Sequence, residues 1–209
     1  MSRSLYFITH PDVVFSPDVP VARWPLSELG RWRMERALGL PWANDLTSVY
    51  SSTERKAVDG ARVLADALGL AVSEVPDLGE NDRSATGYLP PAEFEAVADA
   101  FFGEPDRSVR GWERAVDAQA RIVRAVTAIA GAETSAGSVA IVSHGAVGTL
   151  LYCHLSGRGI SRRWDQPTNG GGNYYRFTLS PRRVHSHWLA IDGLAPPPSR
   201  GGDDQRVGG

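Results

Sequence analysis

The chain has 209 residues, a length that one α/β domain can fold around a single core. Its composition, 42% hydrophobic and 22% charged, is that of a globular protein and excludes a largely disordered or fibrous chain. The formal net charge of -2 leaves no basic surplus, so general attraction to nucleic acid or to an anionic membrane is excluded.

The N-terminal segment and the single cysteine favour a cytoplasmic location. The apolar run from Leu5 to Ile8 is too short for a signal peptide or a transmembrane helix. Cys153 has no partner for an internal disulfide and lies in an apolar run, where a buried free thiol is the usual interpretation. We therefore expect a cytoplasmic protein that does not engage a membrane.

The first half of the chain alternates predicted strands and helices. Residues 4–9 are apolar, β-branched and aromatic, which predicts a buried strand that ends at His10. The segment 27–38 begins with a capping serine and predicts a helix, although its apolar stripe is weak. The pattern then predicts a strand, a helix, a short strand and a loop, over residues 47–51, 57–68, 71–75 and 79–86.

The second half continues this alternation and ends in an antiparallel pair. Helices are predicted over 91–102 and 109–130, a buried strand over 139–143, a helix over 146–155, and paired strands over 173–179 and 184–191. This order predicts a three-layer α/β/α sandwich with a mainly parallel central sheet and an antiparallel edge strand. We expect one domain over 1–193 and a disordered tail over 194–209, which has too little to bury.

Two histidines follow predicted strands at matching positions. His10 and His144 each come directly after an apolar run, and the carboxyl ends of parallel strands meet at one edge of a sheet. A single histidine there is usually a hydrogen-bonded structural residue. Two at matching positions favour a functional site at this edge.

Five motifs resemble those of the histidine phosphatase superfamily, in the same order and at about the same spacing. They are ITH at 8–10, PLSELG at 25–30, SSTERKA at 51–57, LGE at 78–80 and VSHGAVGTLL at 142–151. The resemblance implies an α/β sandwich in which His10 attacks phosphorus and forms a phosphohistidine, which water or a second hydroxyl then resolves. It also implies that His144 hydrogen-bonds the phosphoryl oxygens and that Glu80 protonates the leaving group.

The chain departs from this family at the phosphate pocket. The superfamily signature begins Arg-His-Gly, whereas residues 9–11 are Thr-His-Pro, and the second pocket arginine aligns with Lys56. A lysine offers a point charge without the planar fork of arginine, so the pocket is weakened. We expect phosphate contacts from Thr9, Lys56 and the helix start at Gly145, and we hypothesise that Arg83 replaces the lost guanidinium.

Two further segments give weaker signals. His185 and His187 lie two apart on a predicted strand, a spacing that binds zinc only if further ligands converge, and no such ligands are evident. The run of glycines over 170–172 lacks phosphate-loop spacing and is interpreted as a flexible connection that borders the site.

The leading hypothesis is a metal-independent, cofactor-free phosphomonoesterase that acts on a small phosphorylated metabolite. The main alternative is a catalytically silent family member that binds a phosphorylated or other anionic ligand, including inorganic phosphate or a carboxylate. A second alternative is phosphoryl transfer of the phosphoglycerate mutase type. The sequence leaves open whether the protein forms a homodimer.

Overall fold

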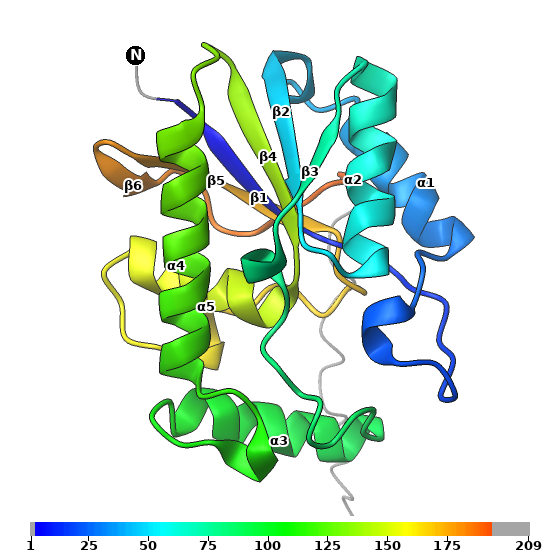
Figure 1. Cartoon of the computed structure of the whole chain (residues 1–209), viewed down its shortest axis with the longest axis vertical. Coiled ribbons are helices and arrows are strands. Elements are labelled where there is room, and N and C mark those ends of the chain that lie inside the picture. The colour runs from blue at the N-terminus through cyan, green and yellow to red at the C-terminus, as the bar shows by residue number, and fades with distance from the viewer. Residues whose placement is uncertain (1–2, 194–209) are drawn as a thin grey trace, which may run out of the picture.

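The computed structural model describes residues 3–193, so the predicted disordered tail lies outside the described residues. The strands form one sheet in the order β3-β2-β4-β1-β5-β6, with β7 beside β5 (Figure 1). They are β1 (Leu5–Thr9), β2 (Leu46–Ser51), β3 (Val72–Glu74), β4 (Ser138–Ser143), β5 (Asn173–Leu179), β6 (Arg182–Val184) and β7 (Leu189–Ala190). Pairing is parallel from β3 to β1 and antiparallel from β1 to β5 and beyond.

Helices cover both faces of this sheet, which confirms the predicted three-layer sandwich. The helices are α1 (Glu28–Ala37), α2 (Arg55–Leu68), α3 (Pro91–Gly103), α4 (Ala115–Ala132) and α5 (Gly145–Leu155). Figure 1 shows α1 and α2 on one side of the strands, α4 and α5 on the other, and α3 across one end. The connection from β1 to β2 contains α1, and the connection from β2 to β3 contains α2. Each of these helices therefore buries one face against the sheet.

The central strands are apolar because both of their faces are buried. All five residues of β1 are buried. Leu5 and Phe7 pack with α4 and α5, whereas Tyr6 and Ile8 pack with α1 and α2. Successive side chains of a strand point to opposite faces, so one continuous apolar run supplies both halves of the core.

Helix α1 has a weak apolar stripe because its buried face contains a charged residue. The hydroxyl of Ser27 accepts a hydrogen bond from the amide of Gly30 at 3.0 Å, which confirms the predicted cap. The buried positions of the helix are Gly30, Arg33, Met34 and Ala37. A charged side chain, that of Arg33, thus lies at the centre of the buried face of α1, and we expect it to have polar partners there.

Two predicted elements are shorter than expected. The helix predicted from residue 109 begins at Ala115, because Arg110 and Gly111 have left-handed φ angles of 51° and 82° that no α-helix accommodates. The strand predicted over 184–191 is interrupted between Val184 and Leu189. His185 and His187 therefore lie on a connection and not on one face of a strand.

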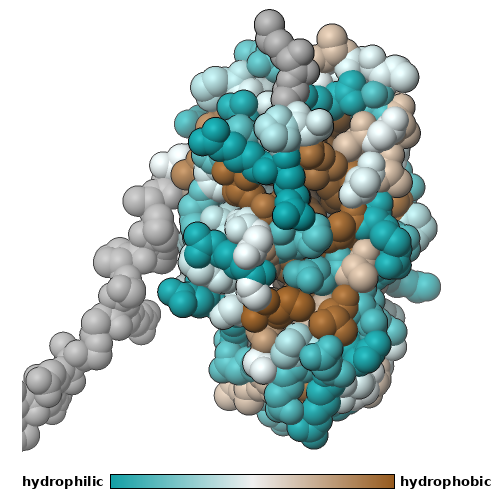
Figure 2. Space-filling model, turned by 90° about the vertical axis from the view of Figure 1, so that its left-hand side faces the viewer, coloured by the Kyte–Doolittle hydropathy of each residue, from teal (hydrophilic) through white to brown (hydrophobic). Residues whose placement is uncertain are grey.

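Polar side chains cover most of the face that Figure 2 presents, with apolar side chains in separate patches between them. In the described part of the chain, no helix is both long and apolar enough to cross a membrane.

Gly148 allows α5 to pack closely against the side chain of Phe7 on β1. A Cβ atom there would lie 2.5 Å from Phe7 and 2.9 Å from Trp188. We predict that Gly148→Ala lowers the free energy of unfolding by about 1–3 kcal/mol, because overpacking forces the core apart. Urea unfolding measures this. The control Gly131→Ala, where nothing lies within 4 Å, should be neutral or slightly stabilising, and equal losses in both variants would contradict this packing.

Candidate active site

The two histidines meet at the carboxyl edge of the sheet. The amide of His10 donates to the carbonyl of Ser143 at 3.0 Å, which aligns the ends of β1 and β4. His144 is the N-cap residue of α5. The two imidazole rings lie 5.2 Å apart, centre to centre, in an edge-to-face arrangement. Two adjacent parallel strands thus bring together the side chains of His10 and His144, which are 134 residues apart in the sequence.

His10 is held as a neutral ring with one nitrogen committed. Its Nδ1 atom lies 2.9 Å from the carbonyl oxygen of Pro11, which can only accept, so Nδ1 carries the proton and donates it. The other nitrogen, Nε2, then bears a lone pair. Burial of the ring, assisted by the charge of Lys56, lowers the pKa of His10 to about 4. The ring is therefore uncharged at neutral pH.

The glycine run over 170–172 packs directly against the backbone of His10. All three glycines have left-handed φ angles, of 80°, 77° and 63°. The amide of Gly172 donates to the carbonyl of His10 at 3.2 Å. A Cβ atom on Gly171 would lie 2.3 Å from the same carbonyl. The run borders the site, as expected, but it is a closely packed turn and not a loose connection.

Arg33 fastens this turn to the segment that follows His10. Its guanidinium binds the carboxylates of Asp12 at 2.8 Å and Asp192 at 2.6 Å. It also donates to the carbonyls of Asn169 and Gly171, both at 2.9 Å. The sequence analysis did not find this residue. The weak apolar stripe of its helix was the signal, because a buried charge lowers the apolar contrast between helix faces.

His144 is surrounded by polar groups of the segment between β2 and α2. Its Nε2 atom lies 2.7 Å from the hydroxyl of Ser52 and 3.2 Å from a carboxylate oxygen of Glu54. Its Nδ1 atom is buried and has no hydrogen-bond partner among the described residues. Burial holds the pKa of His144 well below its ordinary value, although the carboxylate of Glu54 acts in the opposite direction.

Glu54 is the central charge of the cluster, and the sequence analysis did not single it out. One oxygen accepts from the amide of Glu80 at 2.9 Å, and the other lies 2.5 Å from Nζ of Lys56. Burial acts to raise the pKa of Glu54, but the charge of Lys56 and the hydrogen bonds that the carboxylate accepts from Lys56 and from the amide of Glu80 outweigh it and hold the pKa below its ordinary value. The available signal was the acidic residue inside SSTERKA, two positions before the aligned lysine.

Lys56 lies at the centre of the site but has its charge already bound. Besides Glu54, its Nζ atom donates to the carbonyl of Val21 at 2.9 Å, so the loop before α1 covers it. The exposed rings of Phe15 and Tyr88 lie 5.0 Å apart, so this loop also contacts the loop that carries Arg83.

Glu80 occupies the helix start that the sequence predicts as an anion site. Its carboxylate accepts from the amides of Ala146 at 3.2 Å and Val147 at 3.1 Å, and from that of Asn81 at 3.1 Å. Free amides and the helix dipole favour a negative charge there. The first turn of α5 thus holds a carboxylate of the chain itself. Gly145 beside it leaves room for Gln166, whose amide nitrogen would lie 2.5 Å from a Cβ atom.

The hydroxyl of Thr9 is engaged away from this cluster. It donates to Gln166 at 2.7 Å and accepts from the amide of Asn173 at 3.0 Å. Thr9 is buried. Where the family has a guanidinium, this chain has a neutral hydrogen-bond network that joins β1 to β5.

Among the described residues near the site, Arg83 is the cation that forms no ion pair with a carboxylate. Its guanidinium lies over the rings of Phe94 and Trp112, at 5.2 and 5.5 Å from their centres. It adds to the lowering of the pKa of His10, after burial and Lys56. The side chain therefore lies within electrostatic reach of the histidines, and its place in the site stays a prediction.

Within residues 3–193, no group of three or more histidine, cysteine, aspartate or glutamate side chains could hold a metal ion. His185 lies 3.1 Å from the hydroxyl of Thr178, and His187 packs on the ring of Tyr152. Both line a surface pocket of about 460 Å³ that contains neither His10 nor His144.

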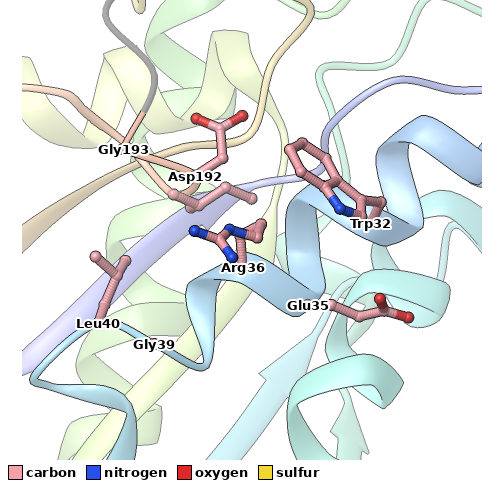
Figure 3. Close-up of a pocket in the computed structure, with 8 residues that line it drawn as sticks. Trp32, Glu35, Arg36, Gly39, Leu40, Asp192 and Gly193 are labelled. Carbon is pink, nitrogen blue, oxygen red and sulfur yellow. The ribbon is translucent and has the colours of Figure 1, made fainter.

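A second surface pocket, of about 540 Å³, lies beside α1 (Figure 3). Figure 3 shows Trp32 and Arg36 of the helix facing the segment with Asp192 and Gly193. None of the clustered site residues lines it. The pocket is therefore a feature of the outer surface of α1 and is separate from the histidine site.

Comparison with protein families places this geometry in a known context. Residues 18–190 match the model of the histidine phosphatase superfamily, branch 1. The matched range begins after His10, where the chain departs from the family signature. Comparison with curated proteins finds no match.

Solved structures share the fold at low sequence identity. A mycobacterial glucosyl-3-phosphoglycerate phosphatase, solved with inorganic phosphate, is 20% identical with a TM-score of 0.74, over 91% of this chain and 99% of that one. YhfR of Bacillus stearothermophilus is 22% identical with a TM-score of 0.75, over 93% and 98%. An Entamoeba histolytica phosphoserine phosphatase, solved with 3-phosphoglyceric acid, is 14% identical with a TM-score of 0.73, over 92% and 100%.

The lowered pKa of His10 predicts how stability depends on pH. The unfolded chain takes up a proton on this ring near pH 6.5, whereas the folded protein does so only near pH 4. Stability should therefore fall as the pH drops from 6.5 to 4, by up to about 3 kcal/mol from His10, and no further below that window. Urea unfolding across this range should give a shallower slope for His10→Asn than for the parent. Equal slopes would show that His10 is protonated in the folded protein.

Proposed function

This chain belongs to the histidine phosphatase superfamily, and from that premise we propose that it is a metal-independent phosphomonoesterase that forms a phosphohistidine on His10. The observation that carries the proposal is the hydrogen bond from Nδ1 of His10 to the carbonyl of Pro11 at 2.9 Å. It fixes the ring with Nε2 unprotonated, the form that a nucleophilic imidazole requires. A ring with pKa about 4 keeps this form at neutral pH.

The reaction proceeds in two displacements at phosphorus. In the first, the lone pair of Nε2 on His10 forms a bond to phosphorus while the bond to the ester oxygen breaks, and the electron pair of that bond leaves with the oxygen. In the second, water attacks phosphorus, the N–P bond breaks, and its electron pair returns to Nε2. The carbonyl of Pro11 stabilises the positive charge that the ring carries between the two steps.

Glu80 is the proposed general base. Its carboxylate accepts hydrogen bonds from the amides of Ala146 and Val147, two and three residues after His144, and from the amide of Asn81. A carboxylate that makes only acceptor contacts is suited to accept the proton of the attacking water in the second step.

The phosphoryl oxygens are proposed to contact Lys56, His144 and Arg83. The imidazole of His144 is 5.2 Å from that of His10, and Lys56 is joined to it through Glu54. Arg83 would leave its aromatic neighbours to approach the anion. Two named structural neighbours are phosphatases of small phosphorylated metabolites, which supports the same substrate class here.

Silent binding of an anion is the second candidate, and Glu54 favours it. This carboxylate already binds the lysine and the imidazole that a phosphoryl group would use. A mutase differs from a phosphatase only in the acceptor of the phosphoryl group, a second hydroxyl in place of water. Release of inorganic phosphate separates the two.

We predict that the parent protein hydrolyses p-nitrophenyl phosphate in the presence of a metal chelator. Replacement His10→Ala should lower kcat by at least about 1,000-fold, because the nucleophile is lost. Intact-mass spectrometry of rapidly quenched parent protein should show a phosphate adduct that His10→Ala lacks. The matched control His187→Ala removes an exposed imidazole outside the site and should keep the parent rate. A well-folded parent with no activity on a panel of esters would favour the silent binder.

Arg83 should matter for binding of the phosphoryl group. We predict that Arg83→Gln lowers kcat/KM by roughly 10- to 100-fold, because one charge-assisted contact in the transition state is lost. The control Arg107→Gln removes an exposed arginine paired with Glu104 and should have no effect. Equal kinetics for the two variants would leave Arg83 as an aromatic-stacking residue of the loop.

A further inference from the structure

The charge of the site is too low for a doubly charged phosphoryl group. Glu54 neutralises Lys56 at 2.5 Å and lies 3.2 Å from Nε2 of His144. Each histidine has at most one ring nitrogen in a donor position: Nδ1 of His10 donates to Pro11, and the buried Nδ1 of His144 has no partner among the described residues. Both rings are therefore held neutral, and burial lowers the pKa of each. Arg83 is the remaining cation within electrostatic reach. A dianion bound here would therefore face the fixed negative charge of Glu54 with little compensation.

The site also lacks a proton for the leaving group. All three hydrogen bonds of the Glu80 carboxylate are accepted from amide N–H groups, two of them at a helix start. Both oxygens are thus acceptors in every contact that the side chain makes, and none of these contacts presents a proton to a leaving oxygen. Glu54 is no proton source either, because its two oxygens accept from Nζ of Lys56 and from the amide of Glu80.

We infer that the site accepts a phosphomonoester as its monoanion, that Glu54 is the specificity-determining residue for this charge state, and that the substrate supplies the proton its own leaving oxygen receives. The inference rests on the phosphomonoesterase activity proposed above. This assignment accounts for both the low positive charge of the site and the missing proton for the leaving group. A singly protonated phosphoryl group carries one negative charge fewer and one proton more than the dianion.

The first displacement then balances without a protein acid. Nε2 of His10 forms the bond to phosphorus, the ester P–O bond breaks, and the phosphoryl proton moves to the departing oxygen, which leaves as an alcohol. The products are the neutral alcohol and a phosphohistidine with a protonated ring and a doubly charged phosphoryl group. Their total charge of minus one equals that of the bound monoanion.

The groups that face Glu54 do not obscure this pH dependence. They are Lys56 on α2, His10 at the end of β1, His144 at the start of α5, and Glu80 in the loop after β3. Arg83 of the same loop contributes at longer range. Both histidines have pKa values below their usual range, so neither ring changes charge between pH 6 and 8. A phosphomonoester loses its second proton at about pH 6.

The test is the pH profile of kcat/KM from pH 5 to 8.5 with p-nitrophenyl phosphate, whose leaving group needs no proton. For the parent we expect a fall of about tenfold per pH unit above about pH 6, as the monoanion disappears. Glu54→Gln keeps the acceptor for the amide of Glu80 but removes the charge. It should flatten the profile and raise kcat/KM at pH 8 on the order of 100-fold. Glu54→Asp keeps the charge and should keep the falling profile.

Two further substrates separate charge from proton supply. Glycerol phosphate has a leaving group that needs a proton, so its hydrolysis by Glu54→Gln should still fall above about pH 6. Bis(p-nitrophenyl) phosphate, a diester with one charge and no phosphoryl proton, should bind the parent as a competitive inhibitor at all these pH values. Diester hydrolysis faster than monoester hydrolysis would overturn the assignment to monoesters.

The control Glu133→Gln removes a carboxylate that accepts from Tyr50, outside the cluster, and should reproduce the parent profile. A flat or rising parent profile between pH 6 and 8, or identical profiles for parent and Glu54→Gln, would overturn the role of Glu54 while leaving the phosphatase intact. Absence of His10-dependent hydrolysis in every folded variant would instead overturn the proposed function. If Glu54→Gln does not fold by circular dichroism, the parent profile and the diester still decide.

Discussion

The geometry of the site depends on one buried guanidinium. Arg33 reaches from the inner face of α1 to two carboxylates and two carbonyls on three separate segments of the chain. Its planar fork suits this arrangement, because several donors with fixed directions can be satisfied at once. A buried charge is costly unless it is fully paired, so the four contacts form together. They hold Asp12 and the glycine turn, which lie on either side of the backbone of His10.

A second electrostatic feature distinguishes this site from the family to which the chain belongs. The family signature places two arginines at the phosphate, whereas here Thr9 is uncharged and Lys56 is neutralised by Glu54. The fold supplies the two histidines through its strand order alone. The charges around them come from separate side chains and do not follow from the strand order. Retained fold and altered charge together explain why family membership does not by itself specify the substrate.

The sequence predicted what depends on local pattern and missed what depends on distant pairing. The strands that deliver His10 and His144 were evident because a strand buried on both faces leaves a continuous apolar run. Arg33 and Glu54 were missed, since an arginine in a helix and a glutamate in a loop are usually exposed. Their partners lie far along the chain, such as Asp192 for Arg33 and His144 for Glu54. The prediction of one strand over 184–191 was wrong at the centre of this segment for a related reason. The pairing of the segment depends on β5, and β6 and β7 pair with it separately.

Glu54 is also the residue immediately before α2, and this position carries a cost for folding. The residue at a helix N-cap usually turns its side-chain oxygen back to the first amides of the helix, but Glu54 makes no such hydrogen bond. Its carboxylate points to Lys56 and His144 instead. Local preference and the demands of the site therefore conflict at this one residue, which is a point of local frustration in the folding landscape. At the start of α2, therefore, the side chain that would cap the helix is used in the charged cluster instead.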